Sequence, residues 1–453
     1  MNSDASTATP LRVAIIGSGP SGFYTAEALL DAERPVEVHM FERLPTPFGL
    51  VRFGVAPDHP KLKSTAAIFE KIAERPGFQF FGNVTVGRDL GIEELRQHYH
   101  ALVFCSGAES DRRLGIPGED LQGSHTATEF VGWYNGHPDY RDHHFDLSSE
   151  AAVVIGQGNV AADVARILSA PIEKLAQTDM ASHALEALHE SKIKVVHVIG
   201  RRGPAQAKFT AQELRELGEL LGVDVEIRSQ DLDLNPESLQ ELADRKNFGA
   251  AKNVDIFRSW NARVRSGDQP RRIVFHFCAS PLELVGNGRV EKMRLSRNRL
   301  AGPAFAQEAA DAGEAFEIPC GLVFRSIGYK GRPIAGLPFE ERKGVVPNEM
   351  GRVNGVPGTY VAGWIKRGPS GIIGTNRACA MQTVETLLKD FPEVSAPLEA
   401  APAIETILAE RRVRTISFAE WKKLDAIEVA AGAPQGKPRE KLTRVQQMLE
   451  YLI

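Results

Sequence analysis

The sequence is poor in cysteine. It has four in 453 residues: Cys105, Cys278, Cys320 and Cys379. No pair has the C-x-x-C spacing of a redox-active dithiol, a structural zinc site or an iron–sulfur cluster, so the spacing argues against all three, and we expect no bound metal. Few, scattered cysteines fit a reducing compartment such as the cytoplasm or an organelle matrix, and we expect the cytoplasm.

The sequence also lacks a long apolar run and a strong excess of charge. No run approaches the ~20 apolar residues of a membrane span. Residues 1–10 show no charged segment followed by an apolar core, so they predict a disordered tail rather than a signal peptide. The net charge of -4, from 54 basic and 58 acidic residues, argues against a dedicated nucleic-acid binder.

Glycine, in contrast, is abundant, and the first concentration is a phosphate-loop pattern. The apolar run 11–16 leads into Gly17-Ser-Gly-Pro-Ser-Gly22, an amphipathic helix follows, and the alternating run 36–41 ends at Glu42. Such glycines let a dinucleotide pyrophosphate approach the backbone at a helix N-terminus, and an acid at the end of the second strand can bind a ribose. The alternative is a glycine-rich turn in another kind of α/β protein.

The same pattern recurs in the middle of the chain. Residues 151–155 form an apolar run, Gly156–Ala161 form the turn, and a helix and a second strand, 194–199, follow. Here the second strand ends in Arg201 and Arg202 instead of an acid. Guanidinium groups pair with a 2′-phosphate, so this unit favours NADP over NAD. The alternative is a solvated basic turn.

A third glycine-rich stretch, 368–374, precedes a predicted helix over 376–388. A helix N-terminus presents free N–H groups and a positive dipole end, which suits an anionic reduced flavin. The alternative is an ordinary loop-to-helix junction.

The predicted fold is α/β, with two Rossmann-like dinucleotide-binding domains, the second inserted in the first. Apolar segments ending in Gly107 and Gly328 indicate where the chain leaves and re-enters the first domain. We assign residues 11–110 and 327–453 to the first domain and 111–326 to the second. Residues 395–402 are an expected linker, and helices are expected over 404–411, 418–431 and 442–452 as a C-terminal tail.

Longer motifs resemble the adrenodoxin reductase-like ferredoxin–NADP reductases, a group of two-dinucleotide-binding flavoproteins. The motifs are PTPFGLVRFGVAPDHP at 45–60, GQGNVA at 156–161, GRRGP at 200–204, ELREL at 213–217 and GWIKRGPSGIIGTN at 363–376. The resemblance implies that the first domain binds FAD and the second NADP(H). Trp364 stands where the wider superfamily often has Asp, which agrees with this group.

The resemblance also implies particular site residues. The FAD contacts would be Gly17, Ser18, Gly19, Pro20, Ser21, Gly22, Glu42, Leu50, Val86, Trp364, Gly371, Ile372 and Ile373. The NADP contacts would be Arg113, Gln157, Gly158, Asn159, Val160, Ala161, Arg201, Arg202 and Glu213, with Gly371 near the nicotinamide. His59, Glu213 and Glu216 would lie near the redox centre.

The expected activity is hydride transfer between NADPH and FAD, followed by transfer of single electrons to a ferredoxin. His59 is a candidate for proton transfer; alternatively it only hydrogen-bonds the backbone, and Glu213 and Glu216 only form a solvated helix face. An acidic ferredoxin would dock on basic residues, for which the candidates are Lys61, Lys63, Arg411, Arg412, Arg414, Lys422 and Lys423.

Two other classes of function stay open at this point. One is an NADPH-dependent diaphorase or quinone reductase, or the flavin subunit of another electron-transfer system. The other is a non-enzymatic flavoprotein that senses NADPH.

Overall fold

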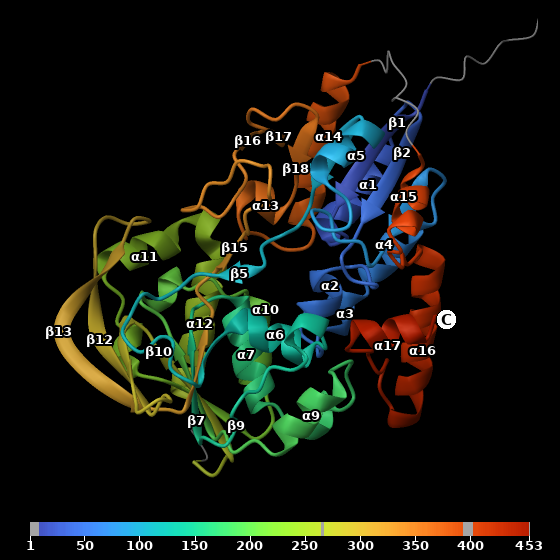
Figure 1. Cartoon of the computed structure of the whole chain (residues 1–453). Coiled ribbons are helices and arrows are strands. Elements are labelled where there is room, and N and C mark those ends of the chain that lie inside the picture. The colour runs from blue at the N-terminus through green and yellow to red at the C-terminus, as the bar shows by residue number, and fades with distance from the viewer. Residues whose placement is uncertain (1–8, 264–266, 393–401, 453) are drawn as a thin grey trace, which may run out of the picture.

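The computed structural model describes residues 9–263, 267–392 and 402–452. Two lobes, each built around a mainly parallel sheet, lie side by side (Figure 1). The expected disordered tail falls mostly on residues 1–8 and the expected linker mostly on 393–401, so both lie outside the described residues. Within the described ranges, no helix is both long and apolar enough to cross a bilayer.

The first lobe contains a seven-stranded sheet in the order β16-β17-β18-β4-β1-β2-β3. Its strands are β1 (Leu11–Ile16), β2 (Val36–Phe41), β3 (Phe78–Phe81), β4 (Ala101–Phe104), β16 (Asn348–Glu349), β17 (Arg352–Val353) and β18 (Thr359–Val361). The five from β18 to β3 are parallel. Because one sheet takes strands from both ends of the chain, the prediction of a discontinuous first domain is confirmed.

The second lobe contains a six-stranded, all-parallel sheet in the order β6-β14-β7-β8-β10-β9. Its strands are β6 (Ser124–Thr126), β7 (Ala151–Ile155), β8 (Val195–Ile199), β9 (Val223–Ile227), β10 (Arg271–His276) and β14 (Leu322–Arg325). All of them come from the middle of the chain, as the inserted domain requires. Strands buried on both faces have near-continuous apolar sequences, which is why β7 and β8 were recognisable.

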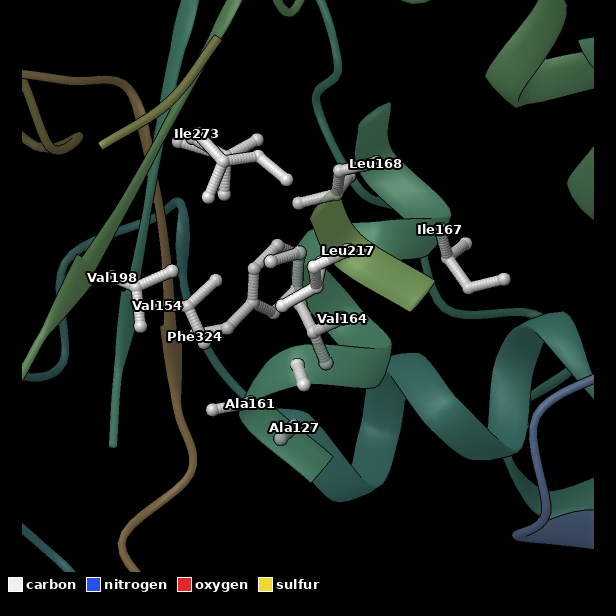
Figure 2. Close-up of a cluster of buried hydrophobic side chains, with 14 of the residues drawn as sticks. Ala127, Val154, Ala161, Val164, Ile167, Leu168, Val198, Leu217, Ile273 and Phe324 are labelled. Carbon is white, nitrogen blue, oxygen red and sulfur yellow. The ribbon is translucent and has the colours of Figure 1, made fainter. Parts of the chain in front are cut away.

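The core of the second lobe lies between this sheet and three helices, α6 (Ala127–Tyr134), α7 (Asn159–Ser169) and α10 (Ala211–Gly218). Figure 2 shows Val164 of α7, Leu217 of α10 and Phe324 of β14 meeting there. All three side chains are fully buried. The apolar stripe predicted for the helix after Gly158 therefore faces this sheet, and the packing positions α7 and α10 beside each other.

The chain crosses between the lobes through two short strands that pair with each other. β5 (Ser110–Asp111) runs antiparallel to β15 (Tyr329–Lys330), between the lobes in Figure 1. The segment 322–328 does not itself return to the first sheet, because β14 pairs with β6 and β7, and the return follows at β15. The boundaries at 110/111 and 326/327 stay predictions.

A three-stranded antiparallel sheet extends the second lobe and was not predicted. It consists of β11 (Ala279–Val285), β12 (Lys292–Ala301) and β13 (Glu308–Pro319). Much of β13 is exposed, so its sequence shows little of the alternation that identifies a half-buried strand.

The C-terminal helices pack on the first lobe. They are α14 (Thr375–Asp390), α15 (Ile404–Glu410), α16 (Phe418–Gly432) and α17 (Val445–Glu450). Trp421 and Met448 are buried with Phe48 and Phe69 in the first-lobe core. Figure 1 shows α16 and α17 beside the short helices α2 (Leu50–Phe53) and α3 (Pro60–Lys63). All four helices were predicted, with ends differing by up to three residues.

The remaining helices are α1 (Pro20–Leu30), α4 (Ala66–Ala73), α5 (Ile92–His98), α8 (Ile172–Leu175), α9 (Ser182–His189), α11 (Pro236–Ala243), α12 (Phe248–Ala262) and α13 (Trp364–Arg367).

Candidate active site

The first phosphate loop joins β1 to α1 and is shaped by its glycines. Gly17 has φ +107°, and a Cβ there would lie 2.7 Å from the Cys105 carbonyl oxygen. A Cβ on Gly22 would lie 2.1 Å from the Gly17 oxygen. At Gly19, in contrast, no described atom lies within 4 Å of the Cβ position, and none of the described side chains caps α1. The loop is therefore tight at both ends and open where a pyrophosphate could meet backbone N–H groups.

Glu42 ends β2 and is bound to this loop. Its Oε2 accepts hydrogen bonds from the Ser18 amide (3.2 Å) and hydroxyl (2.7 Å), and its Oε1 accepts from the Leu44 amide (3.1 Å). The carboxylate thus holds Ser18 in place beside α1. Its contact with a ribose stays a prediction. The segment that contains Val86 lies next to Glu42, because the Val84 amide donates a hydrogen bond to the Glu42 carbonyl.

Two other segments converge on the first loop. A Cβ on Gly49 would lie 2.9 Å from the Gly19 Cα, which places the exposed Leu50 beside the loop. A Cβ on Gly363 would lie 2.5 Å from the Ser21 hydroxyl, which places the next residue, Trp364, beside the first turn of α1. Residues that are distant in sequence therefore line one site.

The chemistry of this site fits a polar dinucleotide. The Ser21 hydroxyl, the Thr46 hydroxyl and the Trp364 indole N–H are buried and have no hydrogen-bond partner among the described residues. Buried polar groups nearly always have partners in native proteins, so these three atoms indicate groups that a ligand satisfies. The Trp364 ring stacks on Tyr329, with centroids 5.5 Å apart, which holds its orientation.

The third glycine-rich stretch leads into α14, which begins at Thr375. Gly371 has φ +83°, and a Cβ there would lie 2.6 Å from the Thr375 hydroxyl. Ile372 is 70% exposed, and its amide donates to that hydroxyl. Ile373 is half-buried against the first-lobe core. The stretch therefore presents backbone next to a helix N-terminus, as predicted, and its flavin contact stays a prediction.

The second phosphate loop repeats the design of the first on the second sheet. Gly156 has φ +147°, and a Cβ there would lie 2.2 Å from the Ser326 carbonyl oxygen. Gly158 has no described atom within 4 Å of its Cβ position, and α7 starts directly after it. Asn159, Val160 and Ala161 form the first turn of α7, and the Gln157 side chain donates to the Arg202 carbonyl.

Arg201 and Arg202 lie at the end of β8, next to this loop. Arg201 is exposed, and its carbonyl accepts a hydrogen bond from Asn298. Arg202 is half-buried and lines a cavity of about 270 Å³ together with Lys208. Arg113 lies elsewhere on the lobe surface and forms an ion pair with Asp120 (2.5 Å). Neither of the two arginines after β8 forms a side-chain ion pair with the described residues, so both can meet a phosphate, whereas Arg113 would have to release Asp120.

His59 and the two predicted glutamates meet at the boundary between the lobes. His59 precedes α3 of the first lobe, and its Nε2 lies 2.6 Å from Oε2 of Glu216 and 3.8 Å from Oε2 of Glu213, both on α10 of the second. His59 and Glu213 are buried, and Glu216 is partly exposed. The ring hydrogen-bonds a carboxylate, so the interpretations of a backbone-only histidine and a solvated face for Glu213 are wrong.

A buried arginine that the sequence did not single out joins this group. Arg166 of α7 is 2% exposed. Its Nε lies 2.6 Å from Asp58, its Nη2 2.6 Å from Asp163, and its Nη1 2.9 Å from Glu213. One guanidinium therefore ties the residue before His59 to the helix that carries the glutamates.

These charges shift the acid–base properties of the group. Burial, reinforced by Asp163, raises the pKa of Glu213 to about 7, although Arg166 and His59 oppose the shift. Burial also raises the pKa of Asp163. At Asp58, burial is outweighed by the hydrogen bond and charge of Arg166, which lower its pKa. Glu213 can therefore hold or release a proton near neutral pH.

Comparison with known proteins identifies the family. Residues 11–247 match the pyridine nucleotide-disulphide oxidoreductase family. The NADPH-ferredoxin reductase FprA of Mycobacterium tuberculosis is 48% identical over 97% of this chain and 98% of its own. The human mitochondrial NADPH:adrenodoxin oxidoreductase is 42% identical over 97% of this chain and 92% of its own. The structure of M. tuberculosis FprA in complex with NADPH superposes with a TM-score of 0.93, at 46% identity, covering 98% of this chain and all of that one.

The chain belongs to the adrenodoxin reductase-like ferredoxin–NADP reductase family.

In this family member, not all of the basic residues predicted to dock a ferredoxin are available on the surface. Lys63 is not on the surface; its ammonium group is held by Asp179 (2.8 Å) with a side chain 14% exposed. Arg411, Arg414 and Lys422 are committed to ion pairs within the first lobe. Lys61, Arg412 and Lys423 are exposed. Position in a basic stretch of sequence does not show which lysine points inward.

Three charged residues of this site were not predicted from the sequence. Asp163 and Arg166 are three apart on a helix whose other face is apolar, and Asp58 precedes His59. Charged residues at i and i+3 normally indicate a solvated face. Only the packing of α7 against α10 and the His59 segment turns that face inward.

Proposed function

We propose that this chain is an FAD-dependent ferredoxin–NADP reductase, in which hydride transfer between NADPH and FAD is coupled to single-electron transfer to a ferredoxin. The observation that carries the proposal is the pair of open phosphate loops, one on each sheet, with Glu42 after the second strand of the first unit and Arg201 and Arg202 after that of the second. Two loops fit two different dinucleotides in one chain. When bound, FAD supplies the conversion between a two-electron hydride and single electrons.

The residues of the first lobe bind and orient the flavin dinucleotide. Gly17–Gly22 offer backbone N–H groups at the start of α1, and Glu42 is placed for the ribose beyond them. Leu50, Val86, Gly371, Ile372 and Ile373 complete the predicted contacts. The unpartnered Trp364 N–H and Ser21 hydroxyl provide hydrogen bonds that fix the ligand's position.

The residues of the second lobe bind NADPH and favour it over NADH. Gln157–Ala161 offer the N-terminus of α7 to the pyrophosphate, and Arg201 and Arg202 hold the 2′-phosphate. Arg113 and Glu213 are the further predicted contacts. His59 shares a hydrogen bond with Glu216 through Nε2, and Glu213 can hold a proton beside them at the boundary between the lobes.

The proposed electron acceptor is a ferredoxin, and the proposed location is a reducing compartment, the cytoplasm. The acceptor is supported by relatives that are named for ferredoxin and adrenodoxin. The exposed Lys61, Arg412 and Lys423 are the basic residues of the predicted set that are placed to attract an acidic carrier.

The test is an assay of the purified, FAD-loaded full-length protein. We expect a yellow protein that NADPH bleaches, and NADPH oxidation with cytochrome c that requires added ferredoxin. Omission of ferredoxin is the control. Fast turnover with quinones or dyes and none with any ferredoxin would favour a diaphorase; a yellow protein that NADPH does not bleach would favour a sensor.

A further inference from the structure

The segment Asp58–Lys63, which contains His59 and α3, is held to the second lobe at both of its ends. We call it the α3 segment. At its start, Asp58 binds the Arg166 guanidinium through two hydrogen bonds of 2.6 and 3.1 Å. At its end, Lys63 binds the Asp179 carboxylate. Both partners belong to the second lobe, so His59 lies between two ionic connections that cross the boundary between the lobes.

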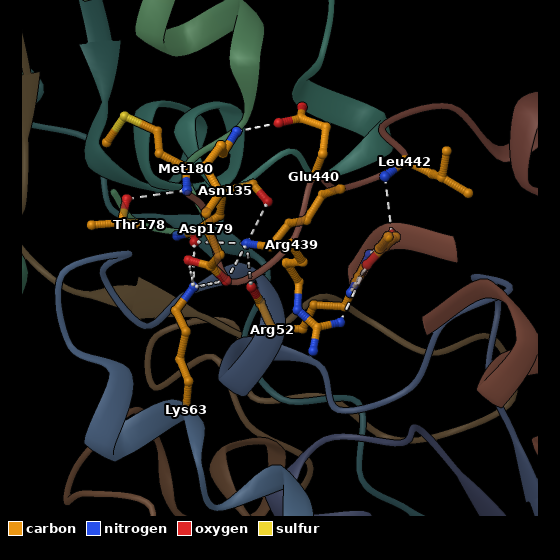
Figure 3. Close-up of polar contacts among 12 residues, drawn as sticks. Arg52, Lys63, Asn135, Thr178, Asp179, Met180, Arg439, Glu440 and Leu442 are labelled. Carbon is orange, nitrogen blue, oxygen red and sulfur yellow. Dashed lines mark hydrogen bonds and ion pairs between the residues drawn. The ribbon is translucent and has the colours of Figure 1, made fainter. Parts of the chain in front are cut away.

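The connection at Lys63 is a buried cluster with a second lysine from the C-terminal tail. Figure 3 shows Lys63 directed toward Asp179 and Asn135. The Lys63 Nζ lies 2.8 Å from each Asp179 oxygen and 3.0 Å from the Asn135 side-chain oxygen. The Lys441 Nζ lies 2.9 Å from the same carboxylate. Lys441 is 1% exposed and Asp179 9%. We call Lys63, Asp179 and Lys441 the anchor.

The tail that carries Lys441 is itself fixed to the first lobe. Glu428 of α16 is fully buried and accepts two hydrogen bonds from Arg52 of α2, at 2.9 and 2.5 Å. The same carboxylate accepts the amide of Leu442, the residue after Lys441. Lys441 also donates to the Arg52 carbonyl. Both lysines of the anchor therefore come from the first lobe, and the acceptor Asp179 from the second.

Buried charges make this contact specific in geometry. Burial, with the repulsion of Lys63 and Arg52, lowers the pKa of Lys441 well below its usual value. At Asp179, burial is outweighed by Lys441 and Lys63, which hold the pKa of the carboxyl low. A desolvated cluster of this kind is stable only when each donor meets its acceptor. Apolar surfaces can slide past each other at small cost, whereas this cluster favours the placement of the two lobes that keeps its contacts.

We propose that Lys63, Asp179 and Lys441 are positioning residues for hydride transfer: the anchor sets the approach of the second lobe to the first. The proposal rests on the proposed function, because it takes NADPH at the second phosphate loop as the hydride donor and FAD at the first as the hydride acceptor. The anchor contacts neither loop. It acts through the α3 segment, which keeps His59 against Glu216, and through the tail, which ties the placement of the second lobe to the first-lobe core.

The test uses the FAD-loaded full-length protein and three variants. Lys441→Met leaves the Lys63–Asp179 pair intact, so one buried lysine still meets one buried carboxylate. Asp179→Asn leaves two buried lysines without a carboxylate. The double variant Asp179→Asn/Lys441→Met removes one of those lysines again. Arg444→Met is the matched control, because Arg444 joins the same tail to Asp142 of the second lobe through an exposed pair at 2.5 Å.

The decisive readouts are the rate of flavin reduction at saturating NADPH and the isotope effect with NADPD deuterated at the transferred position. We expect Lys441→Met to slow flavin reduction at least tenfold and to raise the isotope effect on turnover, with FAD content unchanged. Asp179→Asn should be slower still, and the double variant faster than Asp179→Asn. Arg444→Met should match the parent protein.

The outcomes separate the proposal from its premise. Folded, FAD-loaded Lys441→Met with an unchanged reduction rate and isotope effect would overturn the anchor, even if its melting temperature falls. A parent protein that does not oxidise NADPH at all would overturn the proposed function instead. If Asp179→Asn does not fold, the comparison of Lys441→Met with Arg444→Met still decides the question.

Discussion

His59 and Glu216 are 157 residues apart in the chain, yet the His59 Nε2 lies 2.6 Å from the Glu216 carboxylate across the boundary between the lobes. The histidine comes from the domain with the first phosphate loop, and the glutamate from the domain with the second. The pair therefore connects the two proposed ligand-binding domains directly, which is the geometric reason for testing a proton role at His59.

Replacement of His59 tests its proton role. His59→Gln keeps a side chain that can hydrogen-bond Glu216 but cannot carry a proton near neutral pH. We expect flavin reduction by NADPH to slow by roughly 10²-fold, the lower range for positioned acid–base groups. The exposed His189→Gln is the control. An unchanged rate together with an unchanged pH profile would contradict the role.

The pKa of Glu213, raised to about 7, predicts an inflection near neutral pH. We expect kcat/KM for NADPH to change between pH 6 and 8, and Glu213→Gln to remove that change. The folded state binds the Glu213 proton more tightly than the unfolded state. Glu213 therefore stabilises the fold below the usual glutamate pKa, and this contribution is lost as the pH rises through 7.

The stability consequence of this shift can be measured with the same variant. The melting temperature of the parent protein should fall relative to that of Glu213→Gln as the pH rises from 5 to 8. Glu219→Gln, an exposed glutamate directly after the C-terminus of α10, is the control. A pH-independent difference between parent and Glu213→Gln would show that Glu213 does not titrate in this window.

Arg201 tests the choice of NADP over NAD. Arg201→Ala removes a guanidinium from a 2′-phosphate that NADH lacks, and a hydrogen bond to a charged group contributes about 1.5–3 kcal/mol. We expect KM for NADPH to rise roughly 10- to 100-fold while the NADH parameters change little. Arg258→Ala, an exposed arginine of the same lobe, should leave both unchanged. Equal losses with both nucleotides would contradict the assignment.

The two open glycines should separate the two ligands. A methyl group fits at Gly19 and at Gly158 without meeting any described atom, so both alanine variants should fold. We expect Gly19→Ala to weaken FAD retention, and Gly158→Ala to raise KM for NADPH with FAD retained. FAD content after gel filtration and steady-state kinetics measure the two effects. Loss of FAD from Gly158→Ala would reverse the proposed assignment of the loops.

A different result is expected at Gly22, although it lies in the same loop as Gly19. A methyl group there would lie 2.1 Å from the Gly17 carbonyl oxygen. Gly22→Ala should therefore lower the melting temperature of the protein, as well as its FAD content.

Much of the architecture could be predicted from the sequence because its signals are local. The loops Gly17–Gly22 and Gly156–Ala161 stand between an apolar strand and an amphipathic helix, and each needs glycine for reasons within a few residues. The parallel strand β7 is apolar along its whole length, and in β8 only His197 interrupts the apolar run. Glu42 and Arg201–Arg202 lie at the end of the strand that follows each loop.

The exposed sheet β11–β13 and the ionic clusters had no such local signal. Arg166, Asp163 and Lys63 look like ordinary surface charges, and only long-range packing buries them. Lys63 illustrates the limit: its neighbour Lys61 is exposed, while Lys63 reaches Asp179, 116 residues away.

The sequence by itself thus determined the two nucleotide-binding units, their order and the preference for a 2′-phosphate, because turn geometry and the charge next to a strand end depend on adjacent residues. The tertiary structure alone decided how the units face each other. That placement depends on buried ion pairs between distant segments, from Arg166 with Asp58 to Lys63 and Lys441 with Asp179, whose charges are stabilised only when folding brings donor and acceptor together and excludes water.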